Sequence, residues 1–130
     1  MNGTTASSGK FLHGNLSYAV LGCAQRVHAA LGPGFIKKVY QKALCHELAK
    51  NRAVFQAKAP LEVAYDGVLC GEFEADIFVD EKIIVELKAV DRLCEDHEAQ
   101  ILSYLKASGA RVGLLLNFGQ KSLVVRRFVR

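Results

Sequence analysis

Two acidic residues and a lysine stand out in the sequence because they lie in neighbouring strand-like runs. Asp76 belongs to the first run, Glu86 belongs to the second, and Lys88 follows Glu86 by two positions. Carboxylates that meet on adjacent strands repel each other unless a cation or a proton lies between them. Hard oxygen ligands suit Mg²⁺ or Mn²⁺, and a lysine beside them can hold a phosphate or orient a water. These residue types predict the chemistry of phosphodiester hydrolysis.

A hairpin would bring the two acids together. The charged triplet at 80–82 separates the two apolar runs and predicts the hairpin loop. If Val79 faces Ile83, Asp76 lies directly opposite Glu86, and directly opposed Cβ atoms are about 4.5–5.5 Å apart. Because side chains alternate between the faces of a strand, one face of this hairpin is apolar and the other carries the acids. A register slip of one residue would separate them.

The same charges have a second interpretation. An ion-pair cluster at the end of a sheet would contain the same residue types without any catalytic role, and such clusters stabilise a fold only slightly. An aspartate followed at some distance by Glu-x-Lys also arises by chance. The spacing alone therefore leaves both interpretations open.

Three stretches with helical periodicity surround this hairpin. We expect a first helix with Asn15 as its N-cap, ending at the Gly-Pro-Gly of 32–34. A second helix is expected at 35–51 and a third at 95–108. The residues of the second helix expected to face the core are Phe35, Val39, Ala43 and Leu48.

Three further stretches have the character of strands or turns. Residues 54–63 predict an edge strand or a strand with a break, because Pro60 interrupts them, and Asp66-Gly67 predicts the turn of a hairpin. Strands are also expected at 112–117 and 123–129. No repeat or linker divides the chain, so we expect a disordered segment at 1–14 and a single domain at 15–130.

Composition limits the class of protein. Hydrophobic residues make up 51% of the 130-residue chain, and no apolar run approaches the ~20 residues of a membrane span. The four cysteines form no CxxC pair, so buried thiols are expected, and the lack of a secretion signal predicts a cytoplasmic location. The net charge of +4 favours approach to a polyanion but decides little alone.

Four segments together resemble the GxxExxY protein family, small members of the PD-(D/E)XK nuclease superfamily. They match in order and spacing over nearly the whole chain after residue 15. The segments are LGPGFIKKVYQKAL (31–44), FEADIFVDEKIIVELKAV (73–90), HEAQILSYLKASG (97–109) and VGLLLNFG (112–119).

The resemblance implies a fold and a site. The implied fold is α/β, with a central mixed β-sheet flanked by helices and a restriction-endonuclease-like core. The implied metal site consists of Asp76, Glu86 and the backbone carbonyl of Leu87, with Mg²⁺ or Mn²⁺ as cofactor. Lys88 and Gln100 would complete the catalytic set. Two other residues, His97 and Tyr104, share a stripe of the third helix with Gln100.

One position departs from the family pattern. Gly34 and Tyr40 are present, but the glutamate position between them holds Lys37, and Arg26 stands where relatives often have an acid. A cation in these places removes a carboxylate and competes with a metal ion, so metal affinity should fall. The sequence leaves open whether Tyr40 lies in the core or beside the site.

The same departure extends a basic surface that predicts nucleic-acid binding through phosphates, although a solvated helix face is the default explanation for such charges. The residues of this surface are Arg26, Lys37, Lys38 and Lys42.

Three functions follow. The leading hypothesis is a metal-dependent nuclease of DNA or RNA, impaired by Lys37. The second is an inactive nuclease-fold module that binds nucleic acid or a protein partner. The third is a self-associating structural domain, for which the strand at 123–129 offers an edge that a second copy of the chain could pair with.

Overall fold

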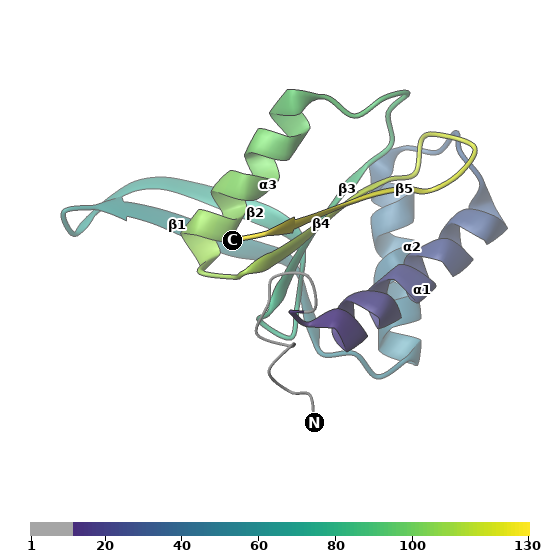
Figure 1. The fold of residues 1–130 in the computed structure, drawn as a ribbon, viewed down its shortest axis with the longest axis horizontal. Coiled ribbons are helices and arrows are strands. Elements are labelled where there is room, and N and C mark those ends of the chain that lie inside the picture. The colour runs from purple at the N-terminus through teal and green to yellow at the C-terminus, as the bar shows by residue number, and fades with distance from the viewer. Residues whose placement is uncertain (1–11) are drawn as a thin grey trace.

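A computed structural model describes residues 12–130 (Figure 1). The predicted disordered segment falls mostly outside this range, and within it Leu12 and His13 form a turn before the first helix. Within residues 12–130, none of the three helices is long and apolar enough to cross a membrane. The helices are α1 (Gly14–Leu31), α2 (Lys37–Lys50) and α3 (Glu95–Ser108). The strands are β1 (Phe55–Tyr65), β2 (Val68–Val79), β3 (Ile83–Lys88), β4 (Val112–Asn117) and β5 (Val124–Val129).

The five strands form one mixed sheet in the order β1-β2-β3-β4-β5. β3 and β4 are parallel, whereas the other neighbours are antiparallel. A parallel pair needs a crossover connection, and α3 provides it. The predicted α/β fold with a central mixed sheet is therefore confirmed, and so is the position of the Pro60-containing strand β1 at an edge.

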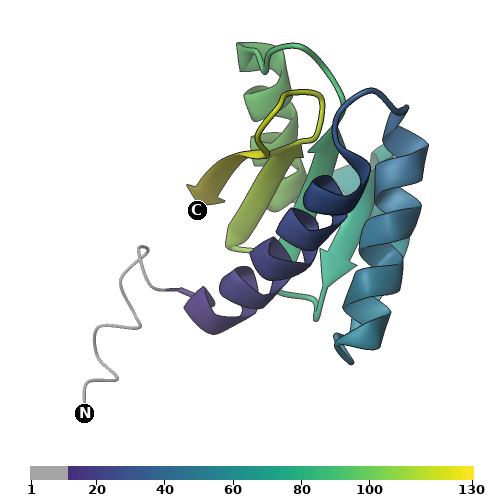
Figure 2. The same ribbon diagram turned by 90° about the vertical axis from the view of Figure 1, so that its right-hand side faces the viewer.

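Helices cover both faces of the sheet (Figure 2). α1 and α2 lie on one face and α3 lies on the other. Alternate strand residues divide between the two cores: Ile77, Val85 and Leu114 pack towards α1 and α2, while Ile84 packs with Ile101 of α3. Burial of such a side chain stabilises the fold by roughly 1.5–3 kcal/mol, so the sheet is fixed from both sides.

The central hairpin has the predicted register. Val79 pairs with Ile83, and Ile77 pairs with Val85. Asp80 and Glu81 make the turn, each with φ of 51° in the left-handed region. Aspartate adopts this region more often than β-branched residues do, so Asp80 is well suited to the turn.

Several predictions of helix detail were wrong. The N-cap of α1 is His13 rather than Asn15, which lies inside the helix. In α2 the buried residues are Tyr40, Leu44 and Leu48, while Phe35 lies before the helix and is half exposed. Leu48 is buried as predicted, but Tyr40 and Leu44 take the core positions expected for Val39 and Ala43. Val39 and Ala43 are also apolar, so periodicity alone did not decide the rotation of the helix.

Tyr40 belongs to the core. Its hydroxyl donates to Gly32 O at 2.6 Å and accepts from Phe35 N at 3.1 Å. The ring is stacked on Phe118 with a centroid distance of 4.8 Å. Tyr40 therefore ties the turn between α1 and α2 to the end of β4.

The cysteines only partly match the prediction of buried thiols. All four are free, and Cys23 is buried while Cys45 is partly buried. Cys70 and Cys94 are exposed, because Cys70 lies on the hairpin of β1 and β2 and Cys94 is the N-cap of α3.

We expect Tyr40→Phe to lower the free energy of unfolding by about 1 kcal/mol, because it removes two part-buried hydrogen bonds of the Tyr40 hydroxyl to the backbone. Urea unfolding measures this change. Tyr18→Phe is the matched control, since Tyr18 is 81% exposed on α1. Equal stability of the Tyr40 variant and the wild type would contradict the role of the hydroxyl.

Candidate functional site

Asp76 and Glu86 meet where β2 and β3 part. The ladder between these strands ends at Ile77 and Val85, one residue before the acids. Beyond it, Asp76 N donates to Glu86 Oε2 at 2.6 Å, and Leu87 N donates to Asp76 Oδ2 at 2.8 Å. The two carboxylates thus take over the hydrogen bonds that backbone carbonyls would otherwise accept, and this arrangement holds them next to each other.

Both acids are buried, which changes the protonation of Glu86. Asp76 is 8% exposed and Glu86 is 2% exposed. The pKa of Glu86 is raised from 4.5 to about 7: burial is the largest cause and the charge of Asp76 the second, while the hydrogen bond from Asp76 N and the charges of Lys37 and Lys88 act in the opposite direction. Near neutral pH the pair therefore favours either a proton or a nearby cation.

Lys37 provides such a cation. Its Nζ lies 2.8 Å from Asp76 Oδ1, and the side chain is 39% exposed. Lys37 is the first residue of α2, so the helix that would carry a glutamate in the family pattern places an ammonium against the acids. One turn later, Gln41 Nε2 donates to Asp76 O at 3.0 Å. Sequence reasoning did not identify Gln41.

Lys88 and Gln100 form the other side of the site. Lys88 Nζ donates to Gln100 Oε1 at 3.1 Å, which joins the end of β3 to α3. The charge of Lys88 acts on Glu86, as its pKa shows. The structure thus brings Asp76, Glu86, Lys88 and Gln100 together, with Leu87 in the same run through its N–H.

The two other residues on α3 have different environments. Tyr104 is buried, and its pKa is raised by burial and then by the charges of Glu86, Asp76 and Glu74. His97 Nδ1 accepts from Cys94 N at 3.1 Å, so His97 caps the start of α3. Tyr104 therefore lies near the acids of the site, whereas His97 has a structural role in capping α3.

Asn117 fixes the chain just after Lys88. Its side chain is fully buried, accepts from Val90 N at 3.0 Å and donates to Val90 O at 2.9 Å. The Asn117 side chain also accepts from Gly119 N, and a Cβ at Gly119 would lie 2.3 Å from Val90 O. Sequence reasoning did not identify this role of Asn117. The signal in the sequence was a polar residue at the end of an apolar strand.

The predicted basic surface is divided in the structure. Arg26 Nε lies 3.0 Å from Glu47 Oε1, so this cation on α1 is paired. Lys37 is paired with Asp76. Lys38 and Lys42 lie on α2 beside β1 and line a groove there.

A family profile described as "PD-(D/E)XK nuclease superfamily" matches residues 14–128. The chain belongs to this superfamily. A comparison with curated proteins gives no match.

Matches from a search of solved structures include two of low sequence identity. The "Crystal structure of SSO0001" has 18% sequence identity and a TM-score of 0.58, and the match covers 72% of this chain and 49% of that one. The chain therefore spans about half the length of that protein. An alkaline exonuclease (LHK-Exo) from Laribacter hongkongensis has 10% identity and a TM-score of 0.46, with 88% and 69% covered. The first likeness supports the fold alone.

The donor set fits a divalent metal ion of the kind that such nucleases generally use. Between 12 and 130, no group of three or more His, Cys, Asp or Glu side chains is placed to hold a metal, so the protein side chains supply two carboxylates. Such oxygen ligands suit Mg²⁺, which keeps several waters. The ammonium of Lys37 already lies against Asp76, which shows that the acids accept a positive charge.

The raised pKa of Glu86 predicts a pH dependence of stability. Since the folded-state pKa of about 7 exceeds the usual 4.5, this contribution to stability is complete below the lower value and is lost as pH rises through the higher one. Between about pH 5 and pH 8, the wild type should lose on the order of 3 kcal/mol relative to Glu86→Gln. Urea unfolding at a series of pH values measures the difference. Parallel curves for the two proteins would contradict this expectation.

Proposed function

We propose that the chain is a GxxExxY-type member of the superfamily that hydrolyses phosphodiester bonds of DNA or RNA with Mg²⁺ or Mn²⁺. The observation that carries the proposal is the buried Asp76–Glu86 pair held at the parting of β2 and β3. A structural ion-pair cluster would lie at the surface and need no second buried acid. Burial of two acids costs free energy, and a function that needs them accounts for this cost.

The residues of the chain have distinct roles in this proposal. Asp76, Glu86 and the carbonyl of Leu87 would hold the metal ion, and the chemistry that such an ion supplies when bound is Lewis-acid polarisation of a phosphoryl oxygen. Lys88 would contact the phosphate, because its ammonium is directed by the hydrogen bond to Gln100. Gln100 would thereby position Lys88 or a water.

Lys37 would reduce the affinity for the metal ion. Its ammonium occupies Asp76 Oδ1 at 2.8 Å, an oxygen that a metal ion would also use. Binding of the metal must therefore break this ion pair. The exposed portion of the side chain allows Lys37 to move away, so impaired activity follows more directly than complete loss.

We expect Lys37→Gln to tighten binding of Mn²⁺ by about tenfold, which corresponds to 1.4 kcal/mol, because the competing charge is removed. Isothermal titration calorimetry measures this affinity without any substrate. Lys38→Gln is the control, since the neighbouring lysine makes no ion pair with residues 12–130. The proposal fails here if the Lys37 variant binds Mn²⁺ no better than the control.

Cleavage tests the activity itself. Wild-type protein is incubated with labelled DNA and RNA, single- and double-stranded, with Mg²⁺, Mn²⁺ or EDTA. We expect metal-dependent cleavage that Glu86→Gln lowers by at least about 100-fold, while Glu72→Gln, an exposed acid on β2, leaves it unchanged. Absence of cleavage by the wild type, or equal cleavage by the Glu86 variant, would reject the enzyme.

An inactive binding module is the second candidate, and the Lys37–Asp76 ion pair favours it. A module would bind nucleic acid without metal in a salt-sensitive way, and Lys37→Glu would weaken this binding. In the impaired enzyme the same substitution would instead raise metal affinity or cleavage. Pairing of two copies along the edge of β5 remains a separate prediction, which sedimentation would test.

A further inference from the structure

A groove lies between α2 and the edge strand β1, with a volume of about 290 Å³. Its α2 side is formed by residues spaced i, i+3, i+4 and i+7, which share one helix face. The lining combines three lysine side chains with smaller, less polar ones. It consists of Lys38, Gln41, Lys42, Cys45, Ala57 and Lys58.

The three lysines of this groove, Lys38, Lys42 and Lys58, form no ion pair with an acid of residues 12–130. The first turn of α2 contains no acid, and the N-terminal end of a helix adds a positive partial charge. The groove is therefore electropositive, and an anion would relieve the repulsion between the three ammonium groups.

Lys58 lies at an irregularity of β1. Its φ of 52° is in the left-handed region, which is uncommon for a residue other than glycine. Pairs form between Ala57 and Ile77 and between Ala59 and Ala75, but no pair joins Lys58 to Asp76. The strand thus departs from regular pairing at the position across from the candidate metal site, and there it contributes a lysine to the groove.

The groove is joined to the candidate metal site. Gln41 lines the groove and donates to Asp76 O at 3.0 Å. Lys37, which precedes Lys38 on α2, contacts the carboxylate of the same aspartate. An extended ligand lying in the groove would therefore reach Asp76 at one end of the groove.

We propose that this groove binds the phosphate backbone of a nucleic-acid strand beside the reacting phosphodiester, with Lys38, Lys42 and Lys58 as the phosphate contacts. The assignment of this strand as the substrate rests on the proposed function. Three phosphate contacts from two elements give binding that is independent of sequence, because no base edge is read. Lys58 extends the predicted basic surface from the helix onto the sheet edge.

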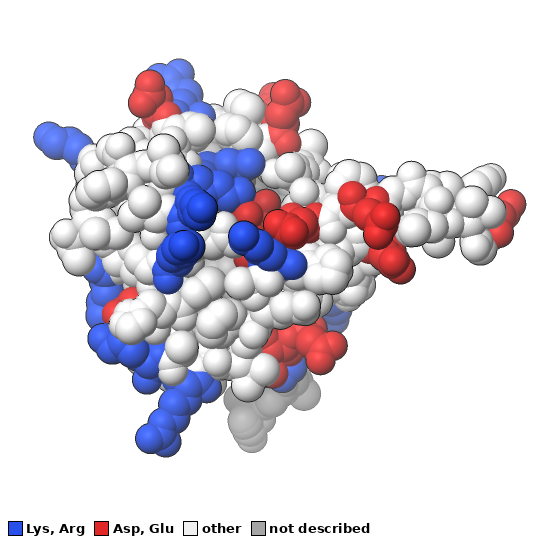
Figure 3. Space-filling model, turned by 180° about the vertical axis from the view of Figure 1, so that it is seen from behind, with Lys and Arg blue, Asp and Glu red and all other residues white. Residues whose placement is uncertain are grey.

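The charges around the groove also favour binding of a nucleic-acid backbone there. The hairpin of β1 and β2 projects as an arm (Figure 1), and its residues 61–74 include four acids and no lysine or arginine. Figure 3 shows acidic side chains along the base and tip of the arm and basic side chains over the body beside it. A polyanion is therefore repelled by the arm and attracted to the α2 side.

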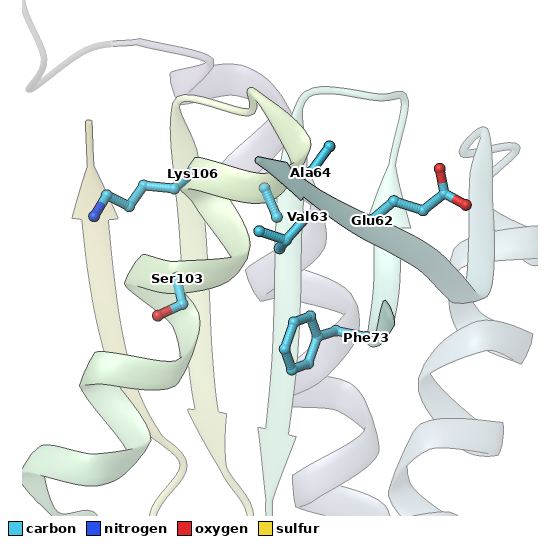
Figure 4. A pocket seen from close by; sticks show the side chains of 7 residues that line it. Glu62, Val63, Ala64, Phe73, Ser103 and Lys106 are labelled. Carbon is cyan, nitrogen blue, oxygen red and sulfur yellow. The ribbon is translucent and has the colours of Figure 1, made fainter. Parts of the chain in front are cut away.

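A larger pocket of about 520 Å³ under the arm is less suited to a phosphate. Phe73 points towards α3 there, while Glu62 and Lys106 extend away on opposite sides (Figure 4). Its single lysine is accompanied by an acid, so the pocket lacks the excess of positive charge that the α2 groove has. Lys106 therefore serves as a control for the groove lysines.

The test measures binding in EDTA, where no cleavage takes place. Fluorescence anisotropy with labelled single-stranded DNA and RNA is recorded at several salt concentrations. For a single strand, each phosphate contact contributes about 0.7 to the slope of log K against log salt. We expect the slope to fall by about 0.7 in each single Lys→Gln variant at 38, 42 and 58, by about 2 in the triple variant, and to remain unchanged in Lys106→Gln.

Three outcomes would overturn the proposal. The first is a triple variant whose salt slope equals that of the wild type. The second is a Lys106→Gln variant whose slope falls as much as that of a groove variant. The third is a mononucleotide that binds as tightly as the oligonucleotide, which would make the ligand a free nucleotide. Thermal melts verify folding, and the single variants provide the result if the triple variant does not fold. Because Glu86→Gln should bind normally in EDTA, a failure of the groove is distinguishable from a failure of the catalytic proposal.

Discussion

Two carboxylates buried next to each other are the constraint on which the rest of this structure depends. Asp76 and Glu86 remain in place because each accepts a backbone N–H from the opposite strand. Their repulsion is reduced in two ways: the pKa of Glu86 rises, and Lys37 brings an ammonium to Asp76. An acid pair of this kind is costly without a charge partner, so the same geometry that suits a metal ion also explains why a lysine is tolerated beside it.

The sheet supplies this geometry through its topology. β3 is antiparallel to β2 and parallel to β4, and it is therefore the strand at which the hairpin and the crossover through α3 meet. The hairpin provides the two acids, and the crossover brings Gln100 to Lys88. Asn117 at the end of β4 fixes the chain at Val90, directly after this run. α2 closes the other side with Lys37 and Gln41, so every layer contributes to one small region.

A lysine at position 37 is compatible with membership of the nuclease superfamily because it offsets part of the negative charge of the site. An acid at the start of α2 would add a third negative charge, whereas Lys37 lowers the total and pairs with Asp76. Lys38 and Lys42, which line the groove next to it, increase the positive potential along α2. Affinity for metal and attraction of phosphate therefore change in opposite directions with the charge of this helix, which is the physical relation between the two candidate functions.

The sequence by itself determined the elements and the hairpin register, because apolar alternation and a charged triplet leave few ways to bury Ile77 and Val85 together. It also brought forward Asp76, Glu86 and Lys88, since the types and spacing of those residues are local properties, whereas Gln100 was implied only by the family resemblance. Only the tertiary structure decided the rotation of α2, the core position of Tyr40 and the contacts of Lys37 and Gln41 with Asp76. All of these features depend on contacts between segments that are far apart in the sequence. Such contacts leave no periodic signal along the chain.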